Sequence, residues 1–296
     1  MKRIDLHIHT NQSDGALSPI EIIDEAKKQE VYTIAIADHD TVGAYTKELF
    51  EYAENNGINI ITAVEISTRI NKCGIHVLGY NIDISNTELI NKLKTLRNAR
   101  HDYLYKVSNK LMELGYIIDI EQLDKIETVT KAHIALNIIN NEKNKEILLK
   151  NFKHVPSKGE FIETIMNEKC PAYVKKETVT PKEAASIIKK AGGKVVLAHP
   201  VAYVYEDNLT DTDISNIIYE MHADGIEANY LYTDRNNHLI NETEKWNKFA
   251  KDNNLFVTIG SDFHIKDGKH VEIGFTNTNF VIDDKTIDEI LNNVKK

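Results

Sequence analysis

Two stretches of the chain alternate short apolar, β-branched runs with amphipathic segments of helical period. The first stretch covers about 80 residues from the N-terminus, and the second begins near residue 180. Strands that alternate with helices in this way form βα units, in which the strands run parallel within one sheet. The pattern therefore predicts an α/β fold, with strands at 3–9, 32–37, 58–65, 75–80, 194–198, 225–229 and 256–261.

Two of the intervening helices have clear start signals. In "LSPIEII", Ser18 fits the N-cap, Pro19 the first helical position and Glu21 the third, and "VTPKEAA" repeats this arrangement from Thr180. A hydroxyl at the N-cap with a glutamate three residues later satisfies two backbone N–H groups reciprocally, and proline is already set for the first turn. Helices are therefore expected to begin at these two points.

The middle of the chain has a different pattern. Residues 86–115 read as one long amphipathic helix, and 132–151 and 158–169 are also of helical type, with no strong strand among them. We therefore expect a barrel-like α/β domain that is split by a mostly helical insertion. The expected boundaries place residues 1–84 and 179–296 in the α/β domain and residues 85–178 in the insertion.

Composition narrows the function. The 296 residues are 42% hydrophobic, and no apolar run reaches the roughly 18 to 20 residues that a membrane span requires. We find no signal-peptide pattern, so a cytoplasmic location and no membrane partner are expected. The net charge of −9 argues against duplex DNA as a partner but leaves a small anionic substrate open. Cys73 and Cys170 form no metal-type spacing and are expected to be packing residues.

The stretch "DLHIHT" at the N-terminus carries the first chemical signal. Successive side chains of a strand point to opposite faces, so Ile4, Leu6 and Ile8 should share one face. His7 and His9 then share the other face with Asp5, at a spacing that suits one metal ion. This signal is weak by itself, and its weight depends on where the other ligand types fall.

The other predicted strands bring histidines and carboxylates to their ends. In parallel α/β barrels the C-terminal strand ends form one rim, where chemistry takes place. Imidazole and carboxylate without thiolate suit manganese, iron or zinc, and two such ions about 3.5 to 4 Å apart generate a hydroxide nucleophile for phosphoryl displacement. The candidates beyond the first pair are His39, Glu65, His76, His199, Asp262 and His264, with Asp38 and Asp40 either orienting His39 or merely structural.

Four motifs resemble those of the PHP (polymerase and histidinol phosphatase) superfamily: "DLHIHTNQSDG", "IADHD", "AHP" and "GSDFH". The segments "VEIS", "HVLGY" and "AGGKVVLAHP" make the chain similar in particular to the stand-alone nucleotide phosphoesterase branch. The resemblance implies a distorted (β/α)7 barrel with two or three divalent ions, manganese first, and iron or zinc as alternatives. It implies one ion held by His7, His9, Glu65 and Asp262, a second by Glu65, His76 and His199, and a third by Asp14, His39 and His264.

The same relatives place cations of the inserted region over the substrate phosphate. Arg97 and Arg100 are the candidates in "LRNARHDYL", with a solvated helix face as the alternative. Where family members often carry Arg-Pro-His-Ile-Ala, this chain has "TKAHIAL", so Lys131 replaces the arginine and His133 matches the histidine. Lysine supplies a point charge without the bidentate fork of arginine, which leaves the substrate in doubt more than the reaction.

These features predict a metal-dependent phosphoesterase. The resemblance implies as substrate a nucleoside 3′,5′-bisphosphate, a 5′-mononucleotide or the 5′ end of a short RNA. Two alternatives stay open: a phosphatase of a non-nucleotide metabolite such as histidinol phosphate, and a non-catalytic metal-binding accessory module. The sequence leaves the native metal and the oligomeric state open.

Overall fold

The computed structural model describes residues 3–234, 238–266, 271–275 and 282–295. Within this part, the chain divides into two compact units. Unit 1 comprises Met1–Leu93 and Val179–Lys296, and unit 2 comprises Lys94–Thr178. The first boundary between these units falls inside the helix α3 (Thr87–Glu113), which starts in unit 1 and continues without a break into unit 2, so the expected insertion of residues 85–178 stays a prediction.

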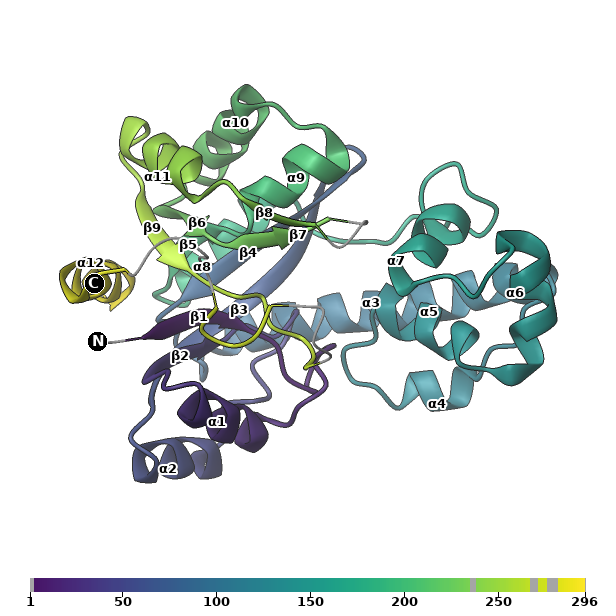
Figure 1. Ribbon diagram of the computed structural model, residues 1–296, viewed down its shortest axis with the longest axis horizontal. Helices are drawn as coiled ribbons and strands as arrows, with labels where there is room; N and C mark the ends of the chain where they lie inside the picture. Colours follow the sequence, from purple (N-terminus) through teal and green to yellow (C-terminus); the bar gives the residue numbers. More distant parts are fainter. Residues whose placement is uncertain (1–2, 235–237, 267–270, 276–281, 296) are drawn as a thin grey trace. The chain divides into compact units, whose positions relative to one another are not determined.

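Unit 1 is built on a seven-stranded sheet with helices packed against it (Figure 1). The strands follow the order β1 (Ile4–Ile8), β2 (Thr33–Ile36), β3 (Asn59–Ile70), β4 (Cys73–Tyr80), β5 (Lys194–Leu197), β6 (Gly225–Asn229) and β9 (Phe256–Ile259). The helices are α1 (Pro19–Lys28), α2 (Lys47–Asn55), α8 (Pro181–Lys190), α9 (Pro200–Asp207), α10 (Asp211–Met221), α11 (Thr243–Asp252) and α12 (Asp284–Lys295). A separate two-stranded sheet pairs β7 (Leu231–Thr233) with β8 (Leu239–Asn241). The mixed α/β class is as predicted, and the caps at Ser18 and Thr180 form the predicted capping boxes.

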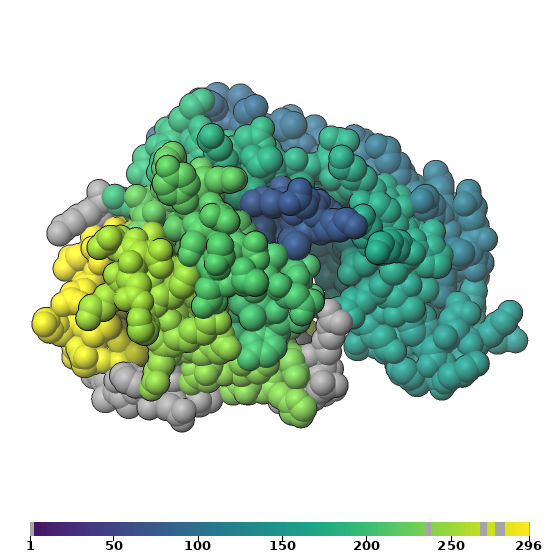
Figure 2. Space-filling view, turned by 90° about the horizontal axis from the view of Figure 1, so that it is seen from above, coloured from purple at the N-terminus to yellow at the C-terminus, as the bar shows by residue number. Residues whose placement is uncertain are grey.

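The expectation that all the strands run parallel is wrong for β4. This strand pairs antiparallel with both β3 and β5, whereas the other ladders of the large sheet are parallel. Only Asn71 and Lys72 separate β3 from β4, and a parallel partner would need a crossover of about a dozen residues or more. The turn of this hairpin, in dark blue, reaches the surface beside the green α9 and α10 (Figure 2), and Cys73 lines a surface pocket with Ile217 of α10.

The inner face of the sheet is layered. In β3, Ile61 and Ala63 belong to one buried apolar cluster, and Glu65 follows on the same face. Because β4 runs in the opposite direction, its Tyr80 and Leu78 join this cluster and His76 comes at the same end as Glu65. Ile287, Ile290 and Val294 of α12 enter the same cluster, and Figure 1 shows α12 beside the start of β1. The apolar rows thus support a row of ligand-type side chains at the opposite end of the strands.

A β-bulge interrupts the regular alternation of β1. From Asp5 to Ile8 the strand advances three residues while β2 advances two, from Ile34 to Ile36. Leu6 therefore packs in the inner cluster, whereas Ile8 packs on the outer face with α1 and α2. The prediction that Ile4, Leu6 and Ile8 share one face is wrong for Ile8 because the bulge changes the facing of the chain between Leu6 and His7. Bulges of this kind are common beside active sites, where they redirect side chains.

The two ends of the sheet approach each other. Ile8 forms a parallel bridge with Phe263, just beyond β9, and the backbone N–H of His9 donates to the Phe263 carbonyl at 2.9 Å. In the described part of the chain β1 and β9 are not paired as strands, so the sheet is curled and the closed (β/α)7 barrel stays a prediction.

Unit 2 is helical around its own buried cluster, which includes Leu104, Leu111 and Phe161. Its elements beyond α3 are α4 (Ile120–Asp124), α5 (Lys131–Ile139), η1 (Glu142–Asn144), α6 (Lys145–Phe152), α7 (Lys158–Phe161) and a π-helical turn η2 (Ile162–Met166). None of the helices in the described ranges combines the length and the apolar character that crossing a membrane would demand.

Candidate metal centre

The nine predicted ligands lie on six strands of unit 1 or on the segments that follow them, most of them at or just beyond strand ends. His7 and His9 come from β1 and the residue after it, His39 follows β2, and Glu65 lies within β3. The carboxyl ends of parallel strands meet at one edge of a sheet, and the antiparallel β4 brings its beginning, with His76, to that same edge. The remaining members are Asp14 after β1, His199 after β5, and Asp262 and His264 after β9.

The first group surrounds the two histidines of β1. Two separations of 3.1 Å join His9 Nε2 to His7 Nε2 and to Asp262 Oδ1. Asp262 Oδ1 is 3.4 Å from His7 Nε2, and the two oxygens of Glu65 lie 3.5 Å from His7 Nε2 and 3.3 Å from His9 Nε2. Ligand atoms that share one ion at about 2.1 Å are separated from each other by about 3.0 to 3.4 Å. The four side chains therefore have the mutual spacing of a metal coordination shell.

Glu65 also faces a second set of imidazoles. Its Oε1 lies 3.0 Å from His76 Nδ1 and 3.3 Å from His199 Nε2, and its Oε2 lies 2.9 Å from His39 Nδ1. Both oxygens of this fully buried carboxylate thus have imidazole nitrogens on more than one side. This is the arrangement that a carboxylate bridging two ions requires.

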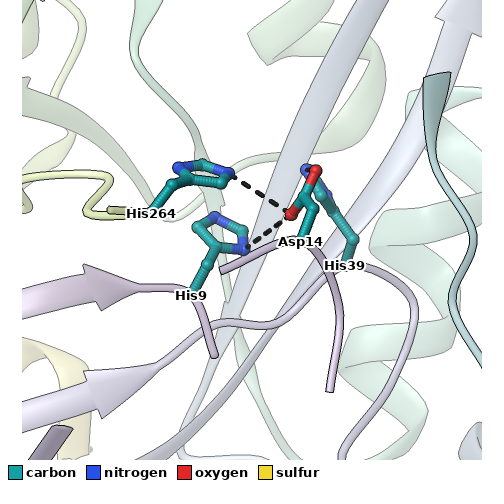
Figure 3. A group of neighbouring side chains, drawn as sticks. All are labelled: His9, Asp14, His39 and His264. Carbon is teal, nitrogen blue, oxygen red and sulfur yellow. Dashed lines mark ion pairs between the residues drawn. The ribbon is translucent and has the colours of Figure 1, made fainter. Parts of the chain in front are cut away.

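A third group gathers around Asp14 (Figure 3). Asp14 Oδ1 lies 3.3 Å from His264 Nε2 and 3.8 Å from His9 Nδ1, and Asp14 Oδ2 lies 3.9 Å from His39 Nε2. One ligand atom from each of these four residues lies within 4.8 Å of the others. His9 and His39 each border two groups, so the assignment of each ligand to one particular ion stays a prediction.

Burial and the neighbouring charges shift the pKa values of the cluster strongly and in different directions. Burial opposes ionisation of Asp14, but the imidazoles of His39 and His264 hold its pKa well below the usual range. Burial likewise opposes protonation of His9, yet Asp262 and Glu65 raise its pKa to about 10. Burial lowers the pKa of His39 to about 4, against the opposing effect of the Glu65 and Asp14 carboxylates.

Three polar atoms of the cluster have no hydrogen-bond partner among the described residues. They are Asp14 Oδ1, Glu65 Oε2 and His199 Nδ1, and all three are buried. Buried polar atoms are costly unless a donor, an acceptor or a metal satisfies them. Six imidazoles and three carboxylates, with no thiolate, form a donor set that suits manganese, iron or zinc.

Backbone strain accompanies the cluster. Asp40, His199 and Asp262 have φ values of 51°, 24° and 53°, in the left-handed region that L-residues rarely adopt. Such conformations persist only where the surroundings hold them, and they gather at functional sites.

The two aspartates that flank His39 do not contact it through the bonds that the structure shows. Asp38 accepts hydrogen bonds from the Thr10 backbone at 2.7 Å and from Ser13 Oγ at 2.5 Å, and Ser13 Oγ lies 3.4 Å from His9 Nδ1. Asp38 therefore supports His9 through Ser13, and a role in orienting His39 stays a prediction. Asp40 accepts from the backbone N–H of Ser67 at 3.0 Å and fastens the chain after His39 to β3.

Glu227 is a buried member of the site that sequence reasoning missed. Its carboxylate lies 3.0 Å from His7 Nδ1, on the side of the ring opposite the first group. The signal was present in "GIEAN", where a single carboxylate interrupts a strand that is buried throughout. Gly260 lies against this pair, since a Cβ there would come 2.2 Å from Glu227 Oε1 and 2.3 Å from His7 Cβ.

The predicted phosphate contacts all lie in unit 2, around the beginning of α5. Thr130 is the N-cap of this helix and bonds reciprocally with His133, while Lys131 Nζ donates to Asn167 Oδ1 at 2.9 Å. Arg100 is buried and donates to the Val129 carbonyl at 3.4 Å. Arg97 of the preceding turn of α3 pairs with Glu127 at 3.1 Å. The four residues therefore belong to one region of unit 2, and their role as phosphate ligands stays a prediction.

The α/β sheet carries histidines and carboxylates in three adjoining groups at its strand ends, as a metal-binding α/β protein does. Comparison with known families agrees with this class. The PHP domain model matches residues 5–167, and the chain belongs to this family. A 5′-3′ exoribonuclease of Haemophilus influenzae is 30% identical over 92% of this chain and 93% of its own length. A 3′,5′-nucleoside bisphosphate phosphatase of Chromobacterium violaceum is 27% identical over 93% of this chain and 92% of its own.

A solved structure gives the same picture of the fold. An amidohydrolase from Chromobacterium violaceum, crystallised with bound sulfate and no metal, aligns with a TM-score of 0.79 at 26% identity. The alignment covers 98% of this chain and 96% of that one.

Proposed function

We propose that this protein is a metal-dependent phosphoesterase that hydrolyses a small nucleotide phosphomonoester or the 5′ end of short oligoribonucleotides. The observation that carries the proposal is the coordination-type spacing of His7, His9, Glu65 and Asp262, with Glu65 facing further imidazoles on its other sides. The relatives named above act, by their names, on nucleoside bisphosphates and on RNA.

The nine clustered ligands would hold two or three divalent ions, manganese first, with iron or zinc as alternatives. Ions in such a cluster lower the pKa of water and neutralise charge on a phosphoryl group. The side chains of this chain hold the site dry on its inner side, because Leu6, Ala63 and Leu78 lie beneath it in the buried cluster.

The cations of unit 2 would bind the substrate phosphate. Lys131 occupies the first position of α5, a nine-residue helix whose N-terminal N–H groups favour an anion. The backbone N–H of Thr130 donates to His133 Nδ1 at 3.1 Å, so in the neutral ring Nε2 carries the proton. His133 can therefore donate from Nε2 to a phosphate oxygen or to the leaving oxygen.

A short substrate fits the charge of the chain. With a net charge of −9, the protein offers no general attraction for a long polyanion, and local cations must supply the binding energy. This favours a mononucleotide or a short RNA end over duplex DNA.

The proposal is tested by release of inorganic phosphate from the phosphomonoesters and by release of a mononucleotide from an RNA dinucleotide. Adenosine 3′,5′-bisphosphate, AMP, histidinol phosphate and a 5′-phosphorylated RNA dinucleotide are incubated separately with manganese-supplemented protein and with its Asp262→Asn variant. We expect turnover of the bisphosphate or of the dinucleotide, abolished in the variant. Turnover of histidinol phosphate alone would overturn the nucleotide assignment, and no turnover of any substrate by metal-loaded protein would overturn the phosphoesterase itself.

A further inference from the structure

Glu227 contacts two of the proposed metal ligands at once. It lies within β6, fully buried, and its Oε1 is 3.0 Å from His7 Nδ1. Its Oε2 accepts the backbone N–H of His199 at 2.8 Å and lies 3.2 Å from the same His7 nitrogen. One carboxylate therefore connects β1 to the end of β5.

The Nε2 atoms of the two histidines face different groups. His7 Nε2 faces Asp262 at 3.4 Å, within the first group, while His199 Nε2 faces Glu65 Oε1 at 3.3 Å, within the second. Their rings are stacked with centroids 5.9 Å apart. Any shift of Glu227 would move both rings relative to their groups.

We propose that Glu227 is a positioning residue that couples two metal positions, by holding His7 with Nε2 directed at the first and by holding the backbone of His199 beside the second. The inference rests on the proposed function, because it requires that these groups bind metal. Glu227 acts through the two histidines and is assigned no contact with substrate.

The tautomer of His7 follows from this contact. A carboxylate accepts and does not donate, so His7 Nδ1 carries the hydrogen and Nε2 keeps its lone pair for a metal. His199 needs a different kind of support, because its φ of 24° is strained and the bond from its N–H to Glu227 helps hold that conformation. Gly260 leaves room for the carboxylate between the strands.

A Glu227→Gln variant separates this role from simple packing. The amide keeps the shape, but its NH₂ must face either His7 Nδ1, at the 3.0 Å position, or the His199 N–H, at the 2.8 Å position. Glu206→Gln is the matched control, because Glu206 of α9 accepts a hydrogen bond from Tyr232 at 3.0 Å and belongs to none of the three metal groups. His76→Ala is the comparator for damage to one position, since His76 contacts Glu65 in the second group.

The measurement is the number of zinc ions retained per chain after dialysis against graded concentrations of a chelator. At a chelator concentration where His76→Ala retains one zinc ion fewer than the wild type, we expect Glu227→Gln to retain two fewer. The apparent affinity of Glu227→Gln for zinc should be about 10- to 100-fold lower than that of the wild type. Glu206→Gln should match the wild type. Retention by Glu227→Gln equal to the control, or loss of only one ion, overturns the coupling.

A spectroscopic readout tests the orientation directly. Long-range ¹H–¹⁵N spectra of histidine-labelled, zinc-loaded protein should show His7 protonated at Nδ1 in the wild type and in Glu206→Gln. In Glu227→Gln we expect this signature to disappear or to be accompanied by that of the other tautomer. An unchanged signature would contradict the positioning role. If the wild type itself retains no metal, the proposed function is wrong. If the wild type binds metal and the Glu227→Gln variant is unaffected, only the inference about Glu227 is wrong.

Discussion

The ligand groups of unit 1 and the cations of unit 2 differ in how their polar atoms are satisfied. In unit 1, the buried Asp14 Oδ1 and Glu65 Oε2 lie 3.3 and 2.9 Å from imidazole nitrogens of His264 and His39, which are themselves candidate metal ligands. In unit 2, Lys131 bonds to Asn167 and Arg97 pairs with Glu127. The carboxylates of unit 1 thus face imidazole nitrogens at the spacing of metal ligands, whereas the cations of unit 2 have protein partners that a phosphate would have to replace.

The largest effect is expected at Glu65. Its two oxygens face imidazoles of all three groups, so Glu65→Gln replaces a carboxylate oxygen by an NH₂ that cannot bind a cation. We expect phosphate release to fall by more than about 100-fold, beyond what loss of a ligand-supporting residue costs. Initial rates with the preferred substrate measure this, with Glu206→Gln as control. Activity within tenfold of the wild type would break the view of unit 1 as the metal centre.

The second-largest expected effect is a loss of stability, caused by a change of packing beneath the cluster of metal ligands. Gly260→Ala would place a methyl group 2.2 Å from Glu227 Oε1, and overpacking of this kind costs about 1 to 3 kcal/mol of unfolding free energy. Urea denaturation followed by circular dichroism measures the loss. Gly159→Ala, in α7 of unit 2, is the matched control, because nothing lies within 4 Å of its added Cβ. Equal stability of the two variants would contradict the tight packing around His7.

The Lys131→Ala variant tests whether a cation of unit 2 binds the substrate. If Lys131 exchanges Asn167 for the substrate phosphate, its removal should raise KM about tenfold and change kcat less, since a hydrogen bond to a charged group is worth about 1.5 to 3 kcal/mol. Steady-state kinetics measures both parameters, and zinc retention should stay as in the wild type. A variant that loses metal instead would place Lys131 in the support of the metal centre.

The smallest effects come from two matched helix caps. Thr180 in unit 1 and Thr130 in unit 2 both form capping boxes, so each Thr→Ala change should cost about 1 kcal/mol of stability. Only Thr130→Ala should also raise KM, because His133 loses a hydroxyl partner that helps to hold its ring. Thermal unfolding and steady-state kinetics on both variants test this pair, and a KM change in Thr180→Ala would remove the distinction.

The strand pattern located the centre because strands constrain their side chains strongly. The ligand types at strand ends were enough to predict that His7, His9 and Glu65 come together, but it is the bulge of β1 that turns the two histidines to the inner face, where Glu65 lies. Ile8 was misplaced because a bulge depends on the partner strand, which a local pattern does not contain. The direction of β4 was predictable in principle from the two residues that precede it.

Contacts between distant segments were harder to predict. The hydrogen bond of Asp38 to Ser13 and that of Glu227 to His199 join residues 25 and 28 positions apart, and nothing in the neighbouring sequence indicates either partner. The cations of unit 2 pose a related problem, because a helix face can carry Arg97 for solvation or for binding with the same local pattern.

The layered inner face of the sheet has a consequence for how the protein is made. Ile61 and Ala63, with Leu78 and Tyr80, complete an apolar interior below the level of the ligands. The polypeptide can thus reach its native form before any cation arrives, unlike small zinc modules that are unfolded without their ion. Folding and metal binding are then expected to be separate events, so that the polypeptide offers a finished site to whichever cation it binds.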